Sequence, residues 1–275
     1  MLTPLLLVVA TFVTAGAILA GWAQWQLLDT GSWRATSGKL LERKEIRDRL
    51  AVYVAGQVRG AAGTALPPVI DAGLRRAVAR GLETASARRS WRAATAEAHR
   101  ELVHLIEDDE RVRGDVVTLD LRPVIRAVAR EDGIPLPALP ETLGQVDVVA
   151  GDQVRGAREA ADRLHRVAIV LLVVAPLRLL LAVVLARGWR ARAIAGAGVS
   201  VAASGALVLL ARALVGAHVV DVLAPAPTDH DAVAAAWSVS TSQLAFAAGA
   251  AIVAGLLVAL VATVAGRAQP RSRYL

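Results

Sequence analysis

The sequence predicts a mainly α-helical membrane protein with four transmembrane helices and an α-rich extracytoplasmic domain that contains a small two-stranded β element. The chain of 275 residues is 55% hydrophobic with a mean hydropathy of +0.49, which is too apolar for an ordinary soluble domain. Four apolar runs are each about 20 residues long, enough to cross ~30 Å of hydrocarbon at ~1.5 Å per residue. Most charged residues lie between the first run and the second. The predicted segments are transmembrane helix 1 over 1–25, the extracytoplasmic domain over 26–165, transmembrane helix 2 over 166–187, a cytoplasmic turn over 188–192, transmembrane helix 3 over 193–214, an outer loop over 215–242, transmembrane helix 4 over 243–266 and a cytoplasmic tail over 267–275.

The first apolar run extends without interruption from Leu5 to Ala23. No Lys or Arg precedes it, and bulky Trp22 and Trp25 follow where a cleaved signal peptide usually has small residues. We therefore expect an uncleaved anchor and not a signal peptide. Indoles favour the membrane–water interface, so four tryptophans are candidate interface anchors. They are Trp22, Trp25, Trp33 and Trp189.

Helical spacing dominates the first half of the predicted domain. Apolar residues recur every three to four positions over 46–58, 70–82 and 91–105, which predicts three amphipathic helices that share a core. The alternating, β-branched segments 116–121 and 145–150 predict two strands that can pair. Between them, a short helix is expected from Pro123 to about Gly133, followed by an extended proline-rich stretch over 134–140.

A single long helix is expected to leave the domain and enter the membrane. It begins with Asp152 as its N-cap, stays polar to about residue 165, and then continues as an apolar run to Arg187.

Charge in the short connections predicts the orientation. Arg187, Arg190 and Arg192 surround the turn after the second span, and three arginines lie in the tail, whereas the segment 215–242 has three Asp and no Lys or Arg. The positive-inside rule places the turn and the tail in the cytoplasm. With four spans, both termini are then cytoplasmic, residues 26–165 are outside, and the protein is a multi-pass protein of the cell membrane.

Composition argues against a nucleic-acid partner and names no chemistry. The net charge is +7, but the residues from Asp29 to His165 hold 22 Lys and Arg against 21 Asp and Glu, so the excess belongs to the membrane flanks. The chain has no Cys, and no phosphate-binding glycine loop, GxSxG, HExxH or paired-carboxylate signature. We expect no cofactor. We also expect no enzymatic activity, although the sequence does not exclude it.

Four stretches give the chain a family resemblance: WQLLDTGSW after the first span, AHRELVHLI, VVTLDLRPVIRAV, and LPALPETLGQVDVV before the second span. In pattern and order the chain resembles a group of uncharacterised actinobacterial four-span integral membrane proteins with an extracytoplasmic domain between the first and second spans. The resemblance covers nearly the whole chain. It implies topology and envelope location and no catalytic residues.

Arg178 is the sharpest candidate for function. It lies near the middle of the predicted second span, and the four predicted spans contain no Asp or Glu. A cation at that depth is costly unless it finds a partner. One interpretation is structural, with hydrogen bonds to water and to Thr14 and Ser204 at a similar depth. The other is functional, with an anionic lipid or substrate group, or an acidic residue of another membrane subunit or second copy, as the partner.

Two further patterns are weaker. Small residues at Gly196, Ser200 and Ser204, and at Ala245 and Gly249, predict that the third and fourth spans pack closely on each other or on a partner. The outer segment also holds acidic residues and histidines without zinc-like spacing, so a solvated loop is expected and a divalent ion site is only a remote alternative. Its members are His218, Asp221, Asp229, His230 and Asp231.

These observations favour a non-enzymatic binding, assembly or sensing module in the lipid bilayer, with the domain coupled to the membrane helices. The alternative is a transport or lipid-handling component in which Arg178 meets an anionic group.

Overall fold

The structure is a computed structural model that describes residues 2–62, 68–107, 117–131, 144–149, 156, 159, 162–163, 165–174, 177, 190–224 and 226–268. The chain forms two compact units. The membrane unit comprises residues 1–25, 162–217 and 241–275. The domain unit comprises residues 26–161 and 218–240. The helix predicted to run from Asp152 to Arg187 lies largely outside the described residues, as do the proline-rich stretch 134–140, Arg178 and Trp189.

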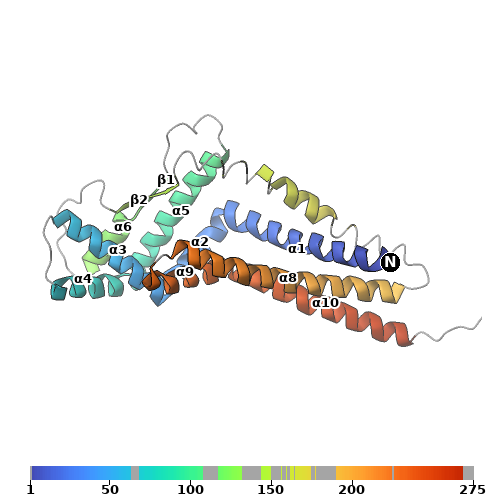
Figure 1. Cartoon of the computed structure of the whole chain (residues 1–275). Coiled ribbons are helices and arrows are strands. Elements are labelled where there is room, and N and C mark those ends of the chain that lie inside the picture. Colours follow the sequence, from blue (N-terminus) through green and yellow to red (C-terminus); the bar gives the residue numbers. More distant parts are fainter. Residues whose placement is uncertain are drawn as a thin grey trace, which may run out of the picture. The chain divides into compact units, whose positions relative to one another are not determined.

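Among the described residues, three helices are long and apolar enough to cross a membrane: α1 (Leu2–Leu28), α8 (Arg190–Leu223) and α10 (Ser242–Ala268) (Figure 1). They occupy the positions of the first, third and fourth predicted spans. The shorter apolar helical stretch His165–Val174 lies at the start of the predicted second span. It approaches α1, where Gln24 Nε2 donates a hydrogen bond of 3.0 Å to His165 Nδ1.

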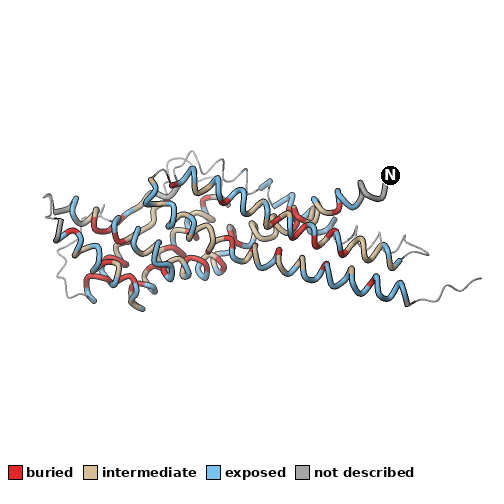
Figure 2. Tube along the Cα trace, turned by 60° about the horizontal axis from the view of Figure 1, so that its bottom comes forward, coloured by how far each residue is buried: buried red, intermediate tan, exposed pale blue. Residues whose placement is uncertain are grey.

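The outer surface of these helices is apolar. Among the described residues, all but four of the exposed large hydrophobic side chains belong to the membrane unit, the exceptions being Val52, Ile70, Val222 and Leu223. Figure 2 shows pale-blue exposed positions along most of α10, the helix that leads into the grey C-terminal trace. A surface of this kind would be costly in water and suits hydrocarbon.

The domain unit is built mainly from amphipathic helices (Figure 1). Its elements are α2 (Thr30–Leu40), α3 (Lys44–Ala62), α4 (Pro68–Gly81), α5 (Ala85–Glu107), β1 (Val117–Asp120), α6 (Arg122–Glu131), β2 (Gln145–Val149) and α9 (Pro227–Ser240). The predicted helices around 46–58, 70–82 and 91–105 are confirmed as α3, α4 and α5, and the short helix after Pro123 is confirmed as α6. Their apolar stripes meet in one core, which includes Leu41, Val54, Leu82, Trp91 and Ile125.

The two predicted strands are also confirmed, and they pair. β1 and β2 are antiparallel, with Leu119 opposite Val146 and an irregularity between Val117 and Thr118. Gly144 enters β2 with a φ of +80°, a backbone conformation that side chains rarely tolerate. A Cβ added there would lie 2.9 Å from Ile125 Cδ1, so this position needs glycine for both reasons.

The segment 215–242 is not a loop, as predicted, but is mostly helical. This segment contains the last turns of α8, which extends to Leu223, and then α9. Residues 218–240 belong to the domain unit, where α9 packs against α2 and α3. Arg49 Nη2 of α3 lies 2.9 Å from Asp229 Oδ2 in the first turn of α9, and the Asp229 side chain is only 16% exposed.

Helix α2 is a second element that sequence periodicity missed. Asp29 is its N-cap, with Asp29 Oδ2 accepting a hydrogen bond of 2.6 Å from Ser32 N. This bond lowers the pKa of Asp29 below its usual range. A lowered carboxylate pKa adds stability above the unfolded-state pKa, and the stability is lost as the pH falls through the folded-state pKa.

Candidate functional site

The predicted intramembrane polar site is only partly within the described residues. Ser204 is fully buried, and its Oγ lies 2.7 Å from Ser200 O on its own helix and 2.9 Å from Thr11 O on α1. Thr11 Oγ1 and Ser200 Oγ are 3.2 Å apart. Thr14 Oγ1 instead donates within α1, to Ala10 O at 2.9 Å. The described hydroxyl groups therefore join α1 to α8 through Thr11, Ser200 and Ser204.

Glycines let α8 and α10 approach until their backbones touch. A Cβ added at Gly198 would lie 2.5 Å from Gly255 O and 2.7 Å from Ala259 N, and one at Gly255 would lie 2.5 Å from Gly198 O. The predicted close packing of the third and fourth spans is thus present, but through other residues than expected. Gly249 has no atom within 4 Å of such a Cβ, and Gly196 meets only a side chain of α1.

Arg212 joins α8 to the start of α10. Its Nε donates a hydrogen bond of 2.8 Å to Thr241 Oγ1, at the junction between α9 and α10. Thr241 is 1% exposed. Arg212 therefore fixes α8 to the junction where α9 ends and α10 begins.

The candidate anchor tryptophans have different environments. Trp25 is exposed, whereas Trp22 packs beside a buried cluster of the membrane unit that includes Ala15 and Val208. Trp33 stacks on His99 within the domain unit, with ring centroids 5.0 Å apart and planes 17° apart. The buried His99 also brings Nδ1 to 3.3 Å from Thr30 Oγ1.

Within the described ranges, no group of three or more His, Asp or Glu side chains is placed to hold a metal ion. The residues of the remote metal alternative lie on α8 and α9, and Asp229 among them is paired with Arg49.

The most distinctive site in the domain unit is an open groove of about 780 Å³ between α2 and α5. Its small lining residues are Gly31, Ala35, Gly38 and Ala93. Its charged lining residues are Arg34, Lys39, Glu42, Arg88, Arg89, Arg92, Glu97 and Arg100. We call these twelve residues the α2–α5 groove. Six cations against two carboxylates leave it with a net charge of +4, although the sequence from Asp29 to His165 is nearly neutral.

The groove lies on a hydrogen-bonded interface between its two helices. Trp91 Nε1 of α5 donates a buried hydrogen bond of 2.8 Å to Ser37 O of α2. Thr95 Oγ1 lies 3.0 Å from Ser37 Oγ, and both side chains are buried. Gln26 Nε2 donates to Thr36 Oγ1 at 2.9 Å. The bonds from Trp91 and Thr95 to Ser37 fix the spacing of α2 and α5, and therefore the width of the groove, whereas the Gln26 bond joins the end of α1 to α2.

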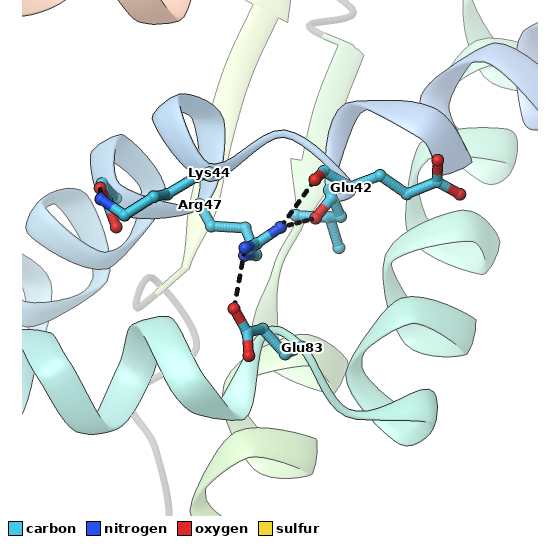
Figure 3. Close-up of polar contacts among 6 residues, drawn as sticks. Glu42, Lys44, Arg47 and Glu83 are labelled. Carbon is cyan, nitrogen blue, oxygen red and sulfur yellow. Dashed lines mark hydrogen bonds and ion pairs between the residues drawn. The ribbon is translucent and has the colours of Figure 1, made fainter.

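Arg47 holds the C-terminal end of α2, at one end of the groove. Arg47 Nη1 donates hydrogen bonds of 2.9 Å to two main-chain oxygens, Leu41 O and Glu42 O, and Arg47 Nη2 donates one of 2.8 Å to Glu83 Oε1. Figure 3 shows Arg47 between Glu42 and Glu83. The Arg47 side chain is only 14% exposed. One guanidinium therefore satisfies the two carbonyls that directly follow α2 and fastens them to the turn after α4.

No family model, no curated protein and no solved structure matches this chain. The site is therefore described by its geometry and charge. Sequence patterns did not reveal the groove, because its cations come from two helices about 50 residues apart and follow no local motif.

Proposed function

We propose that the protein is a four-span integral membrane protein of the cell envelope whose helical domain, placed outside the membrane, is a non-enzymatic binding or sensing module. The proposal rests mainly on α9. This helix joins α8 to α10 along the chain, yet it packs with α2 and α3 inside the domain unit. A change in the domain that shifts the position of α9 would move the segment that connects the two apolar helices α8 and α10.

The rest of the chain supports the same function. Apolar surface concentrates on α1, α8 and α10, as an integral membrane protein requires. The domain has a core of its own and an open, strongly charged groove of ligand size. A ligand biases such a domain only if it binds two arrangements of the helices with different affinity.

Cysteine labelling tests the location of the domain. The chain has no Cys, so Glu101→Cys on α5 and Ser272→Cys in the tail each introduce a single thiol. Glu101 is exposed. A membrane-impermeant maleimide should label Glu101→Cys in intact cells and Ser272→Cys only after permeabilisation. Labelling of Glu101→Cys that requires permeabilisation would refute an outside domain.

Substitution of Arg49 tests whether its ion pair with Asp229 holds α9 against α3. Arg49→Gln leaves Asp229, which is largely buried, without its charged partner, so α9 should open more often. Hydrogen exchange of the purified protein should rise about three- to tenfold over residues 227–240, as expected for a loss of about 0.7–1.4 kcal/mol.

The matched control is Lys44→Gln on the same helix. Lys44 pairs with Asp48 at 2.6 Å, but both side chains are at least half exposed. Its loss should leave α9 exchange unchanged, since exposed pairs contribute little. Equal exchange in the two variants would show that the ion pair does not fasten α9.

A further inference from the structure

We propose that the α2–α5 groove binds a phosphate-bearing anion, either the headgroup of an anionic phospholipid or a soluble phosphate ester. This inference deepens the proposed function and rests on it, because it names the ligand class of the same domain. Four observations carry it: unpaired cations, their position on α5, the space between the helices, and the place of the groove along the chain.

Five of the six cations have no carboxylate partner within the described ranges: Arg34, Lys39, Arg88, Arg89 and Arg92. Arg100 is paired with Glu97 one turn away. Cations held together in one groove repel each other, and this repulsion is relieved when an anion binds among them.

The helix dipole stabilises a cation near the C-terminal end of a helix and destabilises one near the N-terminal end, so the cations of the groove differ in their effect on helix stability. Lys39 lies in the last turn of α2, where a positive charge is favourable. Arg88 and Arg89 lie in the first two turns of α5, which begins at Ala85, where a positive charge is unfavourable and an anion is favourable. Their placement does not stabilise the helix, but it does prepare this end of the groove for an anion.

The space in the groove is preserved by small residues. A Cβ added at Gly38 would lie 3.0 Å from Arg92 Cδ, so the stem of Arg92 crosses α2 where no side chain is present. A volume of about 780 Å³ lies within the ~300–1,000 Å³ typical of small-ligand sites.

Guanidinium chemistry selects phosphate among the small anions. Arginine presents a planar fork of N–H donors that matches two phosphate oxygens, and five of the six cations are arginines. A phosphate group can therefore accept from α2 and α5 at once.

The place of the groove in the chain suggests a source for the phosphate. α1 ends at Leu28 and α2 begins at Thr30, so Arg34 follows the end of an apolar helix by six residues. The extended chain limits that separation to about 21 Å. Phospholipid headgroups are therefore within reach of a domain that starts where a span ends, while a soluble phosphate ester has the same recognition chemistry.

Binding to the purified full-length protein in a non-ionic detergent tests the proposal. The probes are short-chain phosphatidylglycerol, glycerol 3-phosphate and inorganic phosphate, with short-chain phosphatidylcholine as the zwitterionic control. The test variant is Arg34→Gln, Arg88→Gln and Arg89→Gln combined. The matched control combines Arg76→Gln, Arg80→Gln and Arg130→Gln, which removes the same charge from exposed positions outside the groove. Thermal unfolding checks that both variants remain folded.

We expect the wild type to bind at least one phosphate probe about tenfold more tightly than phosphatidylcholine. The groove variant should lose at least about tenfold in affinity, the control variant should stay within about threefold, and added salt should weaken binding. Phosphatidylglycerol binding without glycerol 3-phosphate binding would identify the lipid headgroup as the source. Binding of glycerol 3-phosphate or phosphate would identify a soluble source.

No preference for any phosphate probe, or equal losses in the two variants, would overturn the proposal. The binding experiment tests the ligand class, and the cysteine-labelling experiment tests the location of the domain, so either can fail without the other. A domain that labels from outside but binds no phosphate keeps the proposed location and loses the ligand class, and the reverse result keeps the groove and loses the location.

Discussion

Trp91→Ala is expected to destabilise the domain by about 3–5 kcal/mol, enough to unfold much of it at ordinary temperature. The indole is 7% exposed and lies in the core where α3, α4 and α6 meet α5. The substitution removes this contact area and also leaves Ser37 O without its buried donor, Trp91 Nε1. Hydrogen exchange over α2 and α5 should therefore rise sharply.

Two controls separate the contributions to this effect. Trp91→Phe retains most of the ring volume and loses the hydrogen bond, so it should cost about 1–3 kcal/mol. Trp25→Ala removes an indole that is 53% exposed in the membrane unit, and it should leave exchange in α2 and α5 unchanged. If Trp91→Ala behaves like Trp25→Ala, the indole does not hold the domain core together.

Gly198→Ala is expected to separate α8 from α10 at a cost of about 1–3 kcal/mol. The added methyl group would meet backbone atoms of Gly255 and Ala259, which cannot rotate away as a flexible side chain could. Van der Waals contact between helices is a main source of stability in a membrane, so lost contact is not recovered elsewhere. The midpoint of SDS-induced unfolding in mixed micelles measures the change.

Gly249→Ala makes the same chemical change on α10 and serves as the control. Nothing lies within 4 Å of the new methyl group, and alanine favours a helix more than glycine does. This variant should be as stable as the wild type or slightly more so. Gly255→Ala should reproduce the effect of Gly198→Ala, since each glycine faces the other. Similar midpoints for Gly198→Ala and Gly249→Ala would contradict the close backbone contact.

Hydrophobic spacing predicted the elements that bury apolar stripes. Leu74, Val78 and Leu82 recur at steps of four, and they pack in or against the core of the domain unit as predicted. Leu74 and Val78 lie on α4, and Leu82 follows its last residue. The alternation of the two short strands was equally informative. In these segments the period of the side chains and the period of the backbone agree, so a single sequence suffices.

The missed elements have no periodic stripe of buried apolar side chains. The buried residues of α2 are Ser32, Thr36 and Ser37, which give no apolar stripe. Helix α9 combines an acidic start with alanines, a composition that also suits a loop. In both helices the partner across the interface, and not the local sequence, decides that the segment folds.

The angular positions of the side chains around α8 explain why the small-residue pattern named the wrong residues for the contact with α10. Ser200 and Ser204 lie on the side of α8 that contacts α1, whereas Gly198 contacts α10. On a helix, positions two apart point about 200° away from each other, so a shift of two residues exchanges one neighbouring helix for another. Spacing alone predicted that α8 packs closely, but it could not assign each face to a partner.

The hydroxyl-lined contact between α2 and α5 makes the position of α2 discrete. An apolar interface can slide by fractions of an ångström at small cost, because dispersion attraction has no preferred direction. Here the donors Trp91 Nε1 and Thr95 Oγ1 meet their acceptors on Ser37 in one register only. A partial rotation of α2 would leave Ser37 O without its indole donor and the Thr95 hydroxyl with only Trp91 O on its own helix, so α2 is expected to switch between separate registers and not to drift.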